Sequence, residues 1–430
     1  MPIGWARDSH LEPIIMTPRI PQLRTPLAAM AVAWIVACSA TDQTLLAPDG
    51  DPAEDGSPLP GVFDDDTTVS GELVIREMLR VSRGTTLTVA AGSALLFRDD
   101  GDSIAGIDVA GVLLAQGSAS SPVRFGSADT VPRAGDWEGI YVHGGSAVLA
   151  HTRIDHARIG LRVSGGALAR IDSCVIDSHE QSAVMTESGW ANITGSTLEA
   201  ERFGVRAEGG GVVVRGGSIT GKSEAGFLGH ASTDTVLAAT LDGEDALVID
   251  GGYQTLVRGC VLQGDRYGVS LVGRVSDALI DSNTVLPGMT GIFVVDSRRT
   301  QVSRNTIRKS IDAGIECRDA DVEVTANLVD TCDIGLWVAG GDVMASGNAL
   351  AGNHSDGIRI DAGVPEIVGN SIVGNGGYGV RTEVYGIDAS GNWWGDASGP
   401  YQELYNPGGT GDRVPRVLIV NPWLDAPPSQ

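Results

Sequence analysis

The stretch Gly-Ile-Arg-Ile at residues 357–360 recurs in similar form as Gly-Ile-Tyr-Val at 139–142, Gly-Leu-Arg-Val at 160–163 and Gly-Val-Arg-Thr at 379–382. The small residue that opens each copy returns roughly every 20 to 23 residues, a spacing typical of stacked structural repeats. About 12 such copies follow one another. Their opening residues are Gly139, Gly160, Ser182, Gly204, Gly226, Ala246, Gly268, Gly291, Gly314, Gly335, Gly357 and Gly379.

Each copy alternates apolar and polar residues, which is the pattern of a β-strand with one buried face and one solvent face. One inward pair per copy, at a constant phase, predicts strands that stack in parallel and share a core. The inward pairs are Ile140/Val142, Leu161/Val163, Val205/Ala207, Leu247/Ile249, Val269/Leu271, Ile292/Val294, Leu336/Val338 and Ile358/Ile360.

A second apolar position lies about 15 residues into each repeat, and in the last six repeats an asparagine stands just ahead of it. Asparagine tolerates tight turns, and stacked asparagines can bond to one another as a ladder. The predicted ladder is Asn283, Asn305, Asn327, Asn348, Asn370 and Asn392. The second apolar positions are Ile154, Val175, Leu198, Ile219, Leu241, Val261, Val285, Ile307, Val329, Leu350, Ile372 and Trp394.

The length of the repeat decides the fold class. About 22 residues are too few for a strand–helix–strand crossover, but they are enough for three short strands joined by tight bends. The sequence therefore predicts an all-β protein, a single-stranded parallel β-helix over residues 69–391. Two or three irregular turns are expected before the phased turns begin.

The C-terminal stretch carries a resemblance to a known family. Residues 392–400 read Asn-Trp-Trp-Gly-Asp-Ala-Ser-Gly-Pro, with Asn-Pro-Gly-Gly at 406–409 and Pro-Trp-Leu at 422–424. Together with the repeats, these residues resemble right-handed parallel β-helix repeat proteins of the pectate lyase-like fold, of the bacterial surface lipoprotein type. The resemblance implies a right-handed solenoid. We expect residues 392–430 to form its cap segment, with Trp393 and Trp394 plugging the open end.

Residues 1–38 have the pattern of a secretory signal. The apolar run at 25–37 follows Arg19 and Arg24 and is too short to span a bilayer. It ends in Ile-Val-Ala-Cys at 35–38, which resembles the lipobox of bacterial lipoproteins. The resemblance implies a lipid on Cys38 and, because Ser39 follows, sorting to the outer membrane. The alternative is an ordinary signal peptide and a secreted protein, and Met16 is an alternative translation start.

Residues 39–68 are rich in aspartate, glutamate and proline and contain no lysine or arginine. Such a composition cannot bury a core, so we expect an acidic disordered tether. The whole chain has a net charge of −24 and a pI near 4.5, which argues against nucleic acid as a partner. The expected partners are a membrane, through the lipid, and a polysaccharide or another envelope protein.

Neither a disulfide framework nor a metal site is expected. Cys174, Cys260, Cys317 and Cys332 have no spacing typical of disulfides or zinc sites. The histidines at 143, 151 and 156 share one turn but are assigned to different walls. No cofactor is predicted. Calcium in the acidic turns at 49–51 and 99–102 would be structural or adventitious.

In pectate lyase-like enzymes the substrate lies along the outside of the first strand column, so the resemblance directs attention to the outward residues of that column. Four successive turns place charged and aromatic residues there. Trp337 offers a stacking platform for a sugar, and the charged groups offer hydrogen bonds. A solvated ladder of ion pairs explains the same residues without a ligand. This strip consists of Glu316, Arg318, Trp337, Arg359, Asp361, Arg381 and Glu383.

The sequence favours non-catalytic binding or scaffolding at the cell envelope, directed at polysaccharide, and no catalytic residue is assigned. The polygalacturonase-like motifs Asn-Thr-Asp, Asp-Asp and Gly-His-Gly are absent from the repeats, as is the Asp-Pro-His-Asp motif of alginate epimerases. The alternative is a polysaccharide lyase or glycoside hydrolase acting on the first strand column. A lyase needs clustered carboxylates and a base, and a hydrolase needs paired carboxylates.

The lipid prediction can be tested directly. Replacing Cys38 by serine removes the only thiol in the lipobox, so the protein should leave the membrane fraction and appear in the soluble fraction. Fractionation followed by immunodetection measures this. A Cys38→Ser protein that stays as membrane-associated as the wild type would contradict the prediction.

Overall fold

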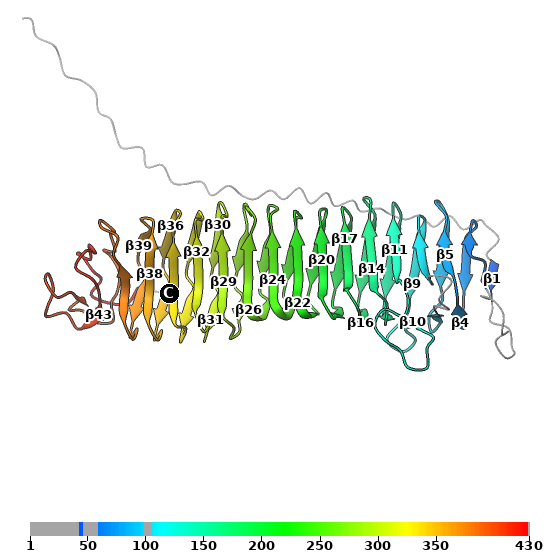
Figure 1. Cartoon of the computed structure of the whole chain (residues 1–430), viewed down its shortest axis with the longest axis horizontal. Coiled ribbons are helices and arrows are strands. Elements are labelled where there is room, and N and C mark those ends of the chain that lie inside the picture. Colours follow the sequence, from blue (N-terminus) through cyan, green and yellow to red (C-terminus); the bar gives the residue numbers. More distant parts are fainter. Residues whose placement is uncertain (1–42, 46–58, 99–104, 429–430) are drawn as a thin grey trace, which may run out of the picture. The chain divides into compact units, whose positions relative to one another are not determined.

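The computed structural model describes residues 43–45, 59–98 and 105–428. These residues form a parallel β-solenoid of about 14 turns with about 22 residues per turn and no helix, which confirms the predicted fold class (Figure 1). In this part of the chain there is accordingly no helix long and apolar enough to cross a membrane. The predicted signal, Cys38 and the acidic turns at 49–51 and 99–102 lie outside the described residues.

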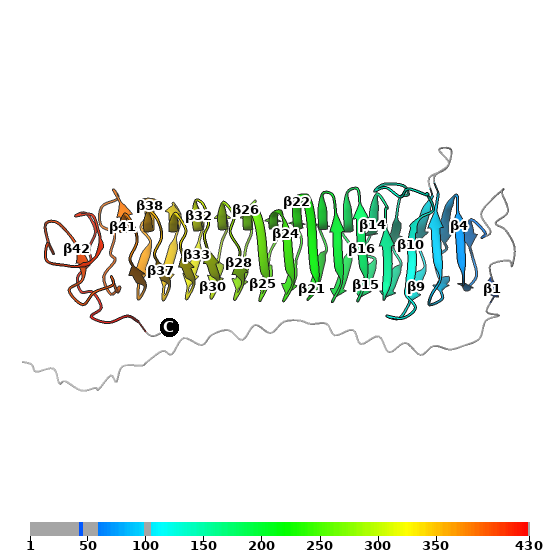
Figure 2. The ribbon, with the colours of Figure 1, turned by 90° about the horizontal axis from the view of Figure 1, so that it is seen from below.

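The strands stack into three faces (Figures 1 and 2). The first face carries the glycine-led strands, each paired in parallel with its counterpart in the next turn. Its strands are β2 (Val62–Phe63), β5 (Met78–Val81), β8 (Gly106–Val109), β11 (Ile140–His143), β14 (Ile159–Ser164), β17 (Ser182–Glu187), β20 (Phe203–Glu208), β29 (Thr290–Val295), β32 (Ala313–Arg318), β35 (Ile334–Ala339), β38 (Asp356–Ala362) and β41 (Tyr378–Thr382).

The second face is a separate 15-stranded sheet. Its strands are β1 (Gln43–Leu45), β3 (Thr67–Val69), β6 (Thr86–Val89), β9 (Val112–Gln116), β12 (Ser146–Ala150), β15 (Leu168–Asp172), β18 (Trp190–Thr194), β21 (Gly211–Arg215), β23 (Thr235–Leu237), β25 (Leu256–Arg258), β27 (Leu279–Asp281), β30 (Thr300–Ser303), β33 (Val322–Thr325), β36 (Val343–Ser346) and β39 (Glu366–Val368).

The third face joins the first through three long strands that continue from one face into the other, β22 (Ser218–His230), β24 (Thr240–Asp250) and β26 (Val261–Val272). Its other strands are β4 (Glu72–Ile75), β7 (Ala94–Phe97), β10 (Val123–Ser127), β13 (Thr152–Asp155), β16 (Val175–His179), β19 (Thr197–Ala200), β28 (Thr284–Val285), β31 (Thr306–Arg308), β34 (Leu328–Asp330), β37 (Ala349–Ala351) and β40 (Ser371–Val373). Beyond them, β42 (Pro400–Tyr401) pairs with β43 (Gly411–Arg413) in the C-terminal segment.

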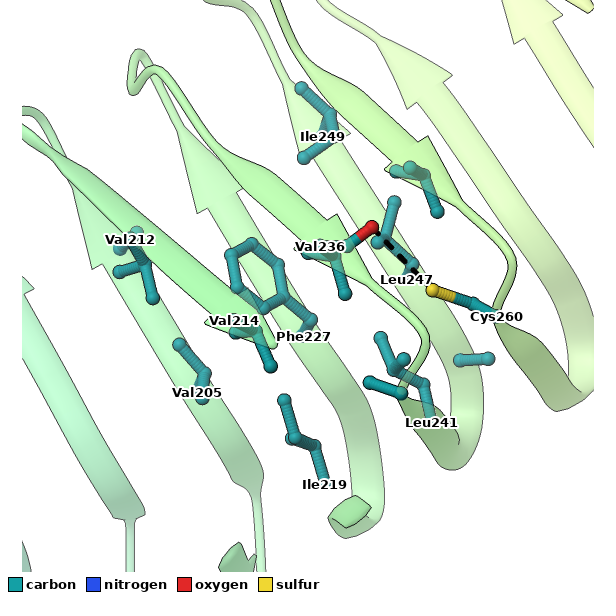
Figure 3. Close-up of a cluster of buried hydrophobic side chains, with 14 of the residues drawn as sticks. Val205, Val212, Val214, Ile219, Phe227, Val236, Leu241, Leu247, Ile249 and Cys260 are labelled. Atoms are coloured by element: carbon teal, nitrogen blue, oxygen red, sulfur yellow. Dashed lines mark hydrogen bonds between the residues drawn. The ribbon is translucent and has the colours of Figure 1, made fainter. Parts of the chain in front are cut away.

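The core is one continuous apolar column between the three faces. The predicted inward pairs are buried and in register, as Leu336, Ile358 and Val380 illustrate. Figure 3 shows how side chains from all three faces meet in the middle turns, with the Cys260 thiol donating to the carbonyl of Val236 at 3.5 Å. The four described cysteines, Cys174, Cys260, Cys317 and Cys332, are buried and unpaired.

Two of the predicted second apolar positions are wrong by one residue. Val261 is exposed and Val175 is half-buried, whereas Leu262 and Ile176 are buried. The cause lies in the residue before each strand: Cys260 occupies the turn position that asparagine takes in later repeats, since its amide donates to Asn283 Oδ1 at 2.9 Å. The residue after that turn position points outward and the following one points inward.

The six asparagines form a buried ladder. In each pair of adjacent turns, the amide and the side-chain Nδ2 of one asparagine both donate to Oδ1 of the next, at 2.8 to 3.0 Å. Asn327 Nδ2 also donates to the carbonyl of Val302 at 2.8 Å. The side chains therefore satisfy backbone groups at bends that a strand ladder cannot reach.

A second ladder runs where the third face turns into the first. The amide of Cys332 donates to Asn353 Oδ1 at 3.1 Å, and the amide of Asn353 donates to Asn375 Oδ1 at 3.0 Å. Asp412 ends the row by accepting from the Asn375 amide at 3.0 Å and from Gly374 at 2.7 Å. This ladder was not predicted from the sequence.

The predicted tether overlaps the solenoid. β2 pairs with β5, β1 pairs with β3, and both Leu59 and Phe63 are buried in the core, so residues 59–68 belong to the first turns. The prediction of a tether rested on the high share of acidic residues over 39–68 and did not take these apolar residues into account. Asp64, Asp65 and Asp66 sit in a turn, where Asp66 Oδ1 accepts from the amide of Thr86 at 2.8 Å.

Replacing Asn327 by alanine should destabilise the protein by about 2–4 kcal/mol, because it leaves the amide of Asn305 and the carbonyl of Val302 buried without partners. Urea unfolding followed by circular dichroism measures the change. Asn192→Ala is the matched control, since Asn192 is half-buried on the outer side of β18, and it should change stability by less than about 0.5 kcal/mol. Equal effects of the two substitutions would contradict the role of the ladder.

Candidate functional site

The outer side of the first face carries a row of large side chains towards its C-terminal end. Register places Phe293, Glu316, Trp337, Arg359 and Arg381 opposite one another on β29, β32, β35, β38 and β41. The row is regular because each strand pairs with the next in parallel, at a spacing of about 4.8 Å. Most of the strip predicted from the sequence thus lies on one surface.

Glu316 takes the outer position in this row but is only 2% exposed. Arg318 pairs with its carboxylate, and the rings of Phe293 and Trp337 stand at the same register position on the neighbouring strands. Burial raises the pKa of the Glu316 carboxyl, and the hydrogen bond from Arg318 opposes that rise. Glu316 therefore supports the surface from beneath rather than presenting a carboxylate to a ligand.

Trp337 is flanked by two guanidinium groups. Arg318 lies 5.4 Å from its ring centroid and Arg359 lies 4.9 Å away, and they come from the strands on either side of β35. The indole Nε1 donates to Asp361 Oδ2 at 2.9 Å. Asp361 reaches the indole from a register shift in β38, and its other oxygen accepts from Arg359 at 2.9 Å. The faces of this ring are occupied, so Trp337 is not the open stacking platform that the sequence suggested.

Arg381 and Glu383 do not pair with each other. Arg381 Nε donates to Asp356 Oδ2 at 2.5 Å, and this hydrogen bond raises the pKa of Arg381. Its guanidinium lies 4.5 Å from the ring centroid of Tyr378. Glu383, in contrast, is exposed and lines a depression at the end of the solenoid. In the Glu316–Asp361 part of the strip, every carboxylate is bound by an arginine, so none of them is free to act as a general base.

A cleft lies between the last turn of the first face and the C-terminal segment. It has two adjoining depressions, of about 380 Å³ and about 730 Å³, which share Tyr385, Arg416 and Val417. Glu383, Glu403 and Arg413 line the smaller depression, and Tyr405 and Trp423 line the larger. This cap cleft was not predicted from the sequence, because most of its residues come from the irregular C-terminal segment, which has no repeat phase.

The C-terminal segment closes the core, as Trp394 is fully buried and belongs to the apolar column. Trp393 is half-buried and bridges to Ser371 of β40. Asp412 attaches the segment to the last turn through Gly374 and Asn375. Burial raises the pKa of the Asp412 carboxyl, and the hydrogen bonds from Asn375 and Gly374 oppose that rise.

A second cluster lies on the N-terminal half of the same face. His143 Nδ1 is 2.8 Å from Asp108 Oδ1, and the His143 ring stacks on Tyr141 at 5.1 Å between centroids. The Tyr141 hydroxyl is 2.9 Å from Ser164 Oγ, and Arg162 lies 5.0 Å from the Tyr141 ring centroid. Asp108, Tyr141 and Arg162 line a cleft of about 220 Å³. From the sequence, His143 was weighed as a metal ligand and as an outward residue of the first strand column, and its approach to Asp108 was not predicted.

Among residues 43–45, 59–98 and 105–428, no group of three or more histidine, cysteine, aspartate or glutamate residues is placed to hold a metal ion. His143, His151 and His156 in particular do not converge on one point.

The comparisons with known proteins agree with the fold. A family model described as "Right handed beta helix region" matches residues 245–392. A mutant of the periplasmic alginate epimerase AlgG is 12% identical over 80% of this chain and 81% of that one, with a TM-score of 0.41. No curated protein sequence matches the chain.

Two other solved structures are similar at the same level. The catalytic domain of a GH87 α-1,3-glucanase in complex with tetrasaccharides is 12% identical over 74% of this chain and 62% of that one, with a TM-score of 0.38. PfbA, a surface adhesin of Streptococcus pneumoniae, is 10% identical over 73% of this chain and 84% of that one, with a TM-score of 0.35. At these identities and TM-scores the likeness assigns no activity and no ligand to this chain.

Replacing Asp412 by alanine should loosen the C-terminal segment, since it removes the acceptor for the amides of Gly374 and Asn375. Hydrogen exchange at these two amides should become about 10- to 100-fold faster, and the asparagine ladder around Asn327 should stay protected. Hydrogen exchange with mass spectrometry measures both. Asp388→Ala is the control, because Asp388 accepts only from Ser390 in its own exposed turn. Unchanged exchange at 374–375 in Asp412→Ala would contradict the attachment.

Proposed function

We propose that this chain, a right-handed parallel β-helix repeat protein, is a lipoprotein of the bacterial cell envelope that binds polysaccharide without cleaving it. The Glu316–Glu383 strip on the first face is the proposed binding surface. The apolar run at 25–37 and the lipobox ending at Cys38 support the envelope location. The acidic residues between Cys38 and the first turn suit a spacer that holds the solenoid off the membrane.

The observation that carries this proposal is the fixed geometry of the arginines along the strip. Arg318, Arg359 and Arg381 are each held by a carboxylate, namely Glu316, Asp361 and Asp356. An arginine that is already fixed loses little side-chain entropy when it binds a ligand. Each guanidinium has five N–H donors and uses only part of them in its ion pair, so donors remain for sugar hydroxyls or carboxylates.

The spacing of the strip also suits a polymer. Successive strands repeat at about 4.8 Å, so one extended chain lying across β32, β35, β38 and β41 would meet similar donors at regular intervals. Arg359 and Arg381 follow one another in the row and would meet the polar edges of successive sugars, whereas the ring of Trp337 is already covered by guanidinium groups. The strip leads at Glu383 into the cap cleft, which extends the surface with a concave end.

An enzyme acting on polysaccharide is the second candidate function. The observation that favours it is the distance of 2.8 Å between His143 Nδ1 and Asp108 Oδ1 beside the N-terminal cleft, because an imidazole next to a carboxylate can move a proton. The Glu316–Glu383 strip suits catalysis less well, since Glu316 and Asp361 are engaged by arginines. A docking face for another envelope protein is the third possibility that the binding assay separates.

Replacing Arg359 by alanine should weaken binding to a polysaccharide by about 10-fold, because it removes a fixed charged donor from the centre of the strip. Co-sedimentation of the purified full chain with a panel of uronate and neutral polysaccharides measures this. Arg215→Ala is the matched control: Arg215 is exposed on the second face, and its loss should leave binding unchanged.

The same samples separate the candidate functions. Growth of ultraviolet absorbance from unsaturated products that is lost in His143→Ala would favour a lyase. A wild-type protein that binds no polysaccharide of the panel would contradict the proposal and favour a protein partner. If Arg359→Ala and Arg215→Ala bind polysaccharide equally well, the strip is not the binding surface.

A further inference from the structure

We propose that the cap cleft is the place where a sugar ring stacks, with Tyr385 and Tyr405 as the stacking platform. This inference rests on the proposed function and adds to it the position and the chemistry of one sugar subsite. Neither tyrosine belongs to the strip that the sequence suggested. Both line the larger depression of the cleft, and Tyr385 also lines the smaller one.

Most aromatic rings on the first face and at its bends are covered by a guanidinium group. A sugar stacks on a ring only where one face of that ring is open. In the described part of the chain, the ring of Trp337 is flanked by Arg318 and Arg359, and Tyr378 has Arg381 and Arg413 at 4.5 and 4.8 Å. Other rings there also have a guanidinium over them, namely Tyr141, Phe203, Tyr267 and Phe293.

Tyr385 and Tyr405 differ from all of these. Tyr385 is 81% exposed and Tyr405 is 71% exposed. No ring contact, cation–π contact or side-chain hydrogen bond involves either tyrosine among the described residues. An aromatic ring in a depression leaves apolar area in contact with water, and covering that area with the apolar face of a sugar would be favourable.

The charges of the cleft wall also favour a sugar. Arg413 and Arg416 are exposed and make no ion pair with any described residue, in contrast to Arg318, Arg359 and Arg381. Glu383 and Glu403 line the smaller depression with them and are likewise without an ion-pair partner among the described residues. Two cationic and two anionic side chains thus line the smaller depression, which offers both N–H donors and carboxylate acceptors. This balance suits hydroxyl groups, which both donate and accept, better than it suits a strongly anionic or cationic ligand.

The cleft also lies directly beyond the end of the strip. The smaller depression begins at Tyr378 and Glu383 of the last turn, next to Arg381 of the strip. A chain that lies along β32 to β41 would therefore continue into the cleft without leaving the surface. The occupant that these observations favour is a hydroxyl-rich pyranose ring of the same polysaccharide, rather than a second copy of the chain or an apolar peptide.

The test compares Tyr385→Ala and Tyr405→Ala in the full chain, with cellohexaose and hexagalacturonate as probes and isothermal titration calorimetry as the readout. Each substitution should weaken both probes by about 10-fold and by a similar factor, because stacking does not depend on sugar charge. Tyr385→Phe and Tyr405→Phe keep the ring and should bind as the wild type does. Tyr253→Ala is the matched control, as Tyr253 is 59% exposed and lies in the middle turns away from the cap.

The outcomes are distinct. Wild-type binding that is unchanged in both alanine variants, but lost in Arg359→Ala, overturns the stacking site and leaves the proposed function standing. A wild type that binds neither probe but binds a polysaccharide of the panel overturns the stacking site alone, and a wild type that binds neither the probes nor the panel overturns both. A loss that the phenylalanine variants share assigns the effect to the hydroxyl group and overturns the platform. Concentration-dependent dimerisation by light scattering that disappears in Tyr385→Ala would identify the occupant as a second copy and overturn the sugar assignment.

Discussion

Parallel stacking in register is the constraint on which the rest of this structure depends. Each residue of one turn lies against its counterpart about 22 residues away, so a side chain must be compatible with two neighbours of the same position. Inside the coil this produces apolar columns such as Leu336, Ile358 and Val380. At the bends, where strand pairing stops, it produces the asparagine ladder, in which each Oδ1 from Asn305 onward satisfies two N–H donors of the turn before. A buried bend without such partners would leave backbone groups unsatisfied at a cost of about 1–3 kcal/mol each.

The same constraint organises the outer surface of the first face. Large and charged side chains that stack at about 4.8 Å must neutralise or cover one another. Arg318, Arg359 and Arg381 accordingly pair with carboxylates and lie over rings. This pairing makes the strip rigid, and it also uses up the stacking faces of Trp337. Open rings and unpaired charges occur together where the repeat ends, in the cap cleft. The regular part of the solenoid thus contributes fixed arginines to the proposed site, and its end contributes open aromatic rings and unpaired charges.

The sequence was sufficient for the features that follow from the repeat. The turn length, the inward pairs of the first face and the ladder from Asn283 to Asn392 were all predicted from the phase alone. The repeat phase gives the wrong inward residue where the turn asparagine is replaced by another residue. After Cys260 the predicted inward residue was Val261, whereas the buried residue is Leu262. The second ladder was detectable in principle, since Asn353 and Asn375 are 22 residues apart, but Asp412 joins it from outside the repeat. The burial of Glu316 depends on where Arg318 and Trp337 place their side chains, which alternation does not encode. The cap cleft depends on tertiary folding of an irregular segment and has no sequence period.

The central claim is that polysaccharide binds along the outer side of the first face and enters the cap cleft. A crystal structure of the full chain with bound hexasaccharide tests it most directly. We expect a sugar ring against Tyr385 and Tyr405, with the rest of the polysaccharide running past Arg381 towards Arg359. Sugar bound instead in the N-terminal cleft beside His143 and Asp108, or on the second face, would contradict it.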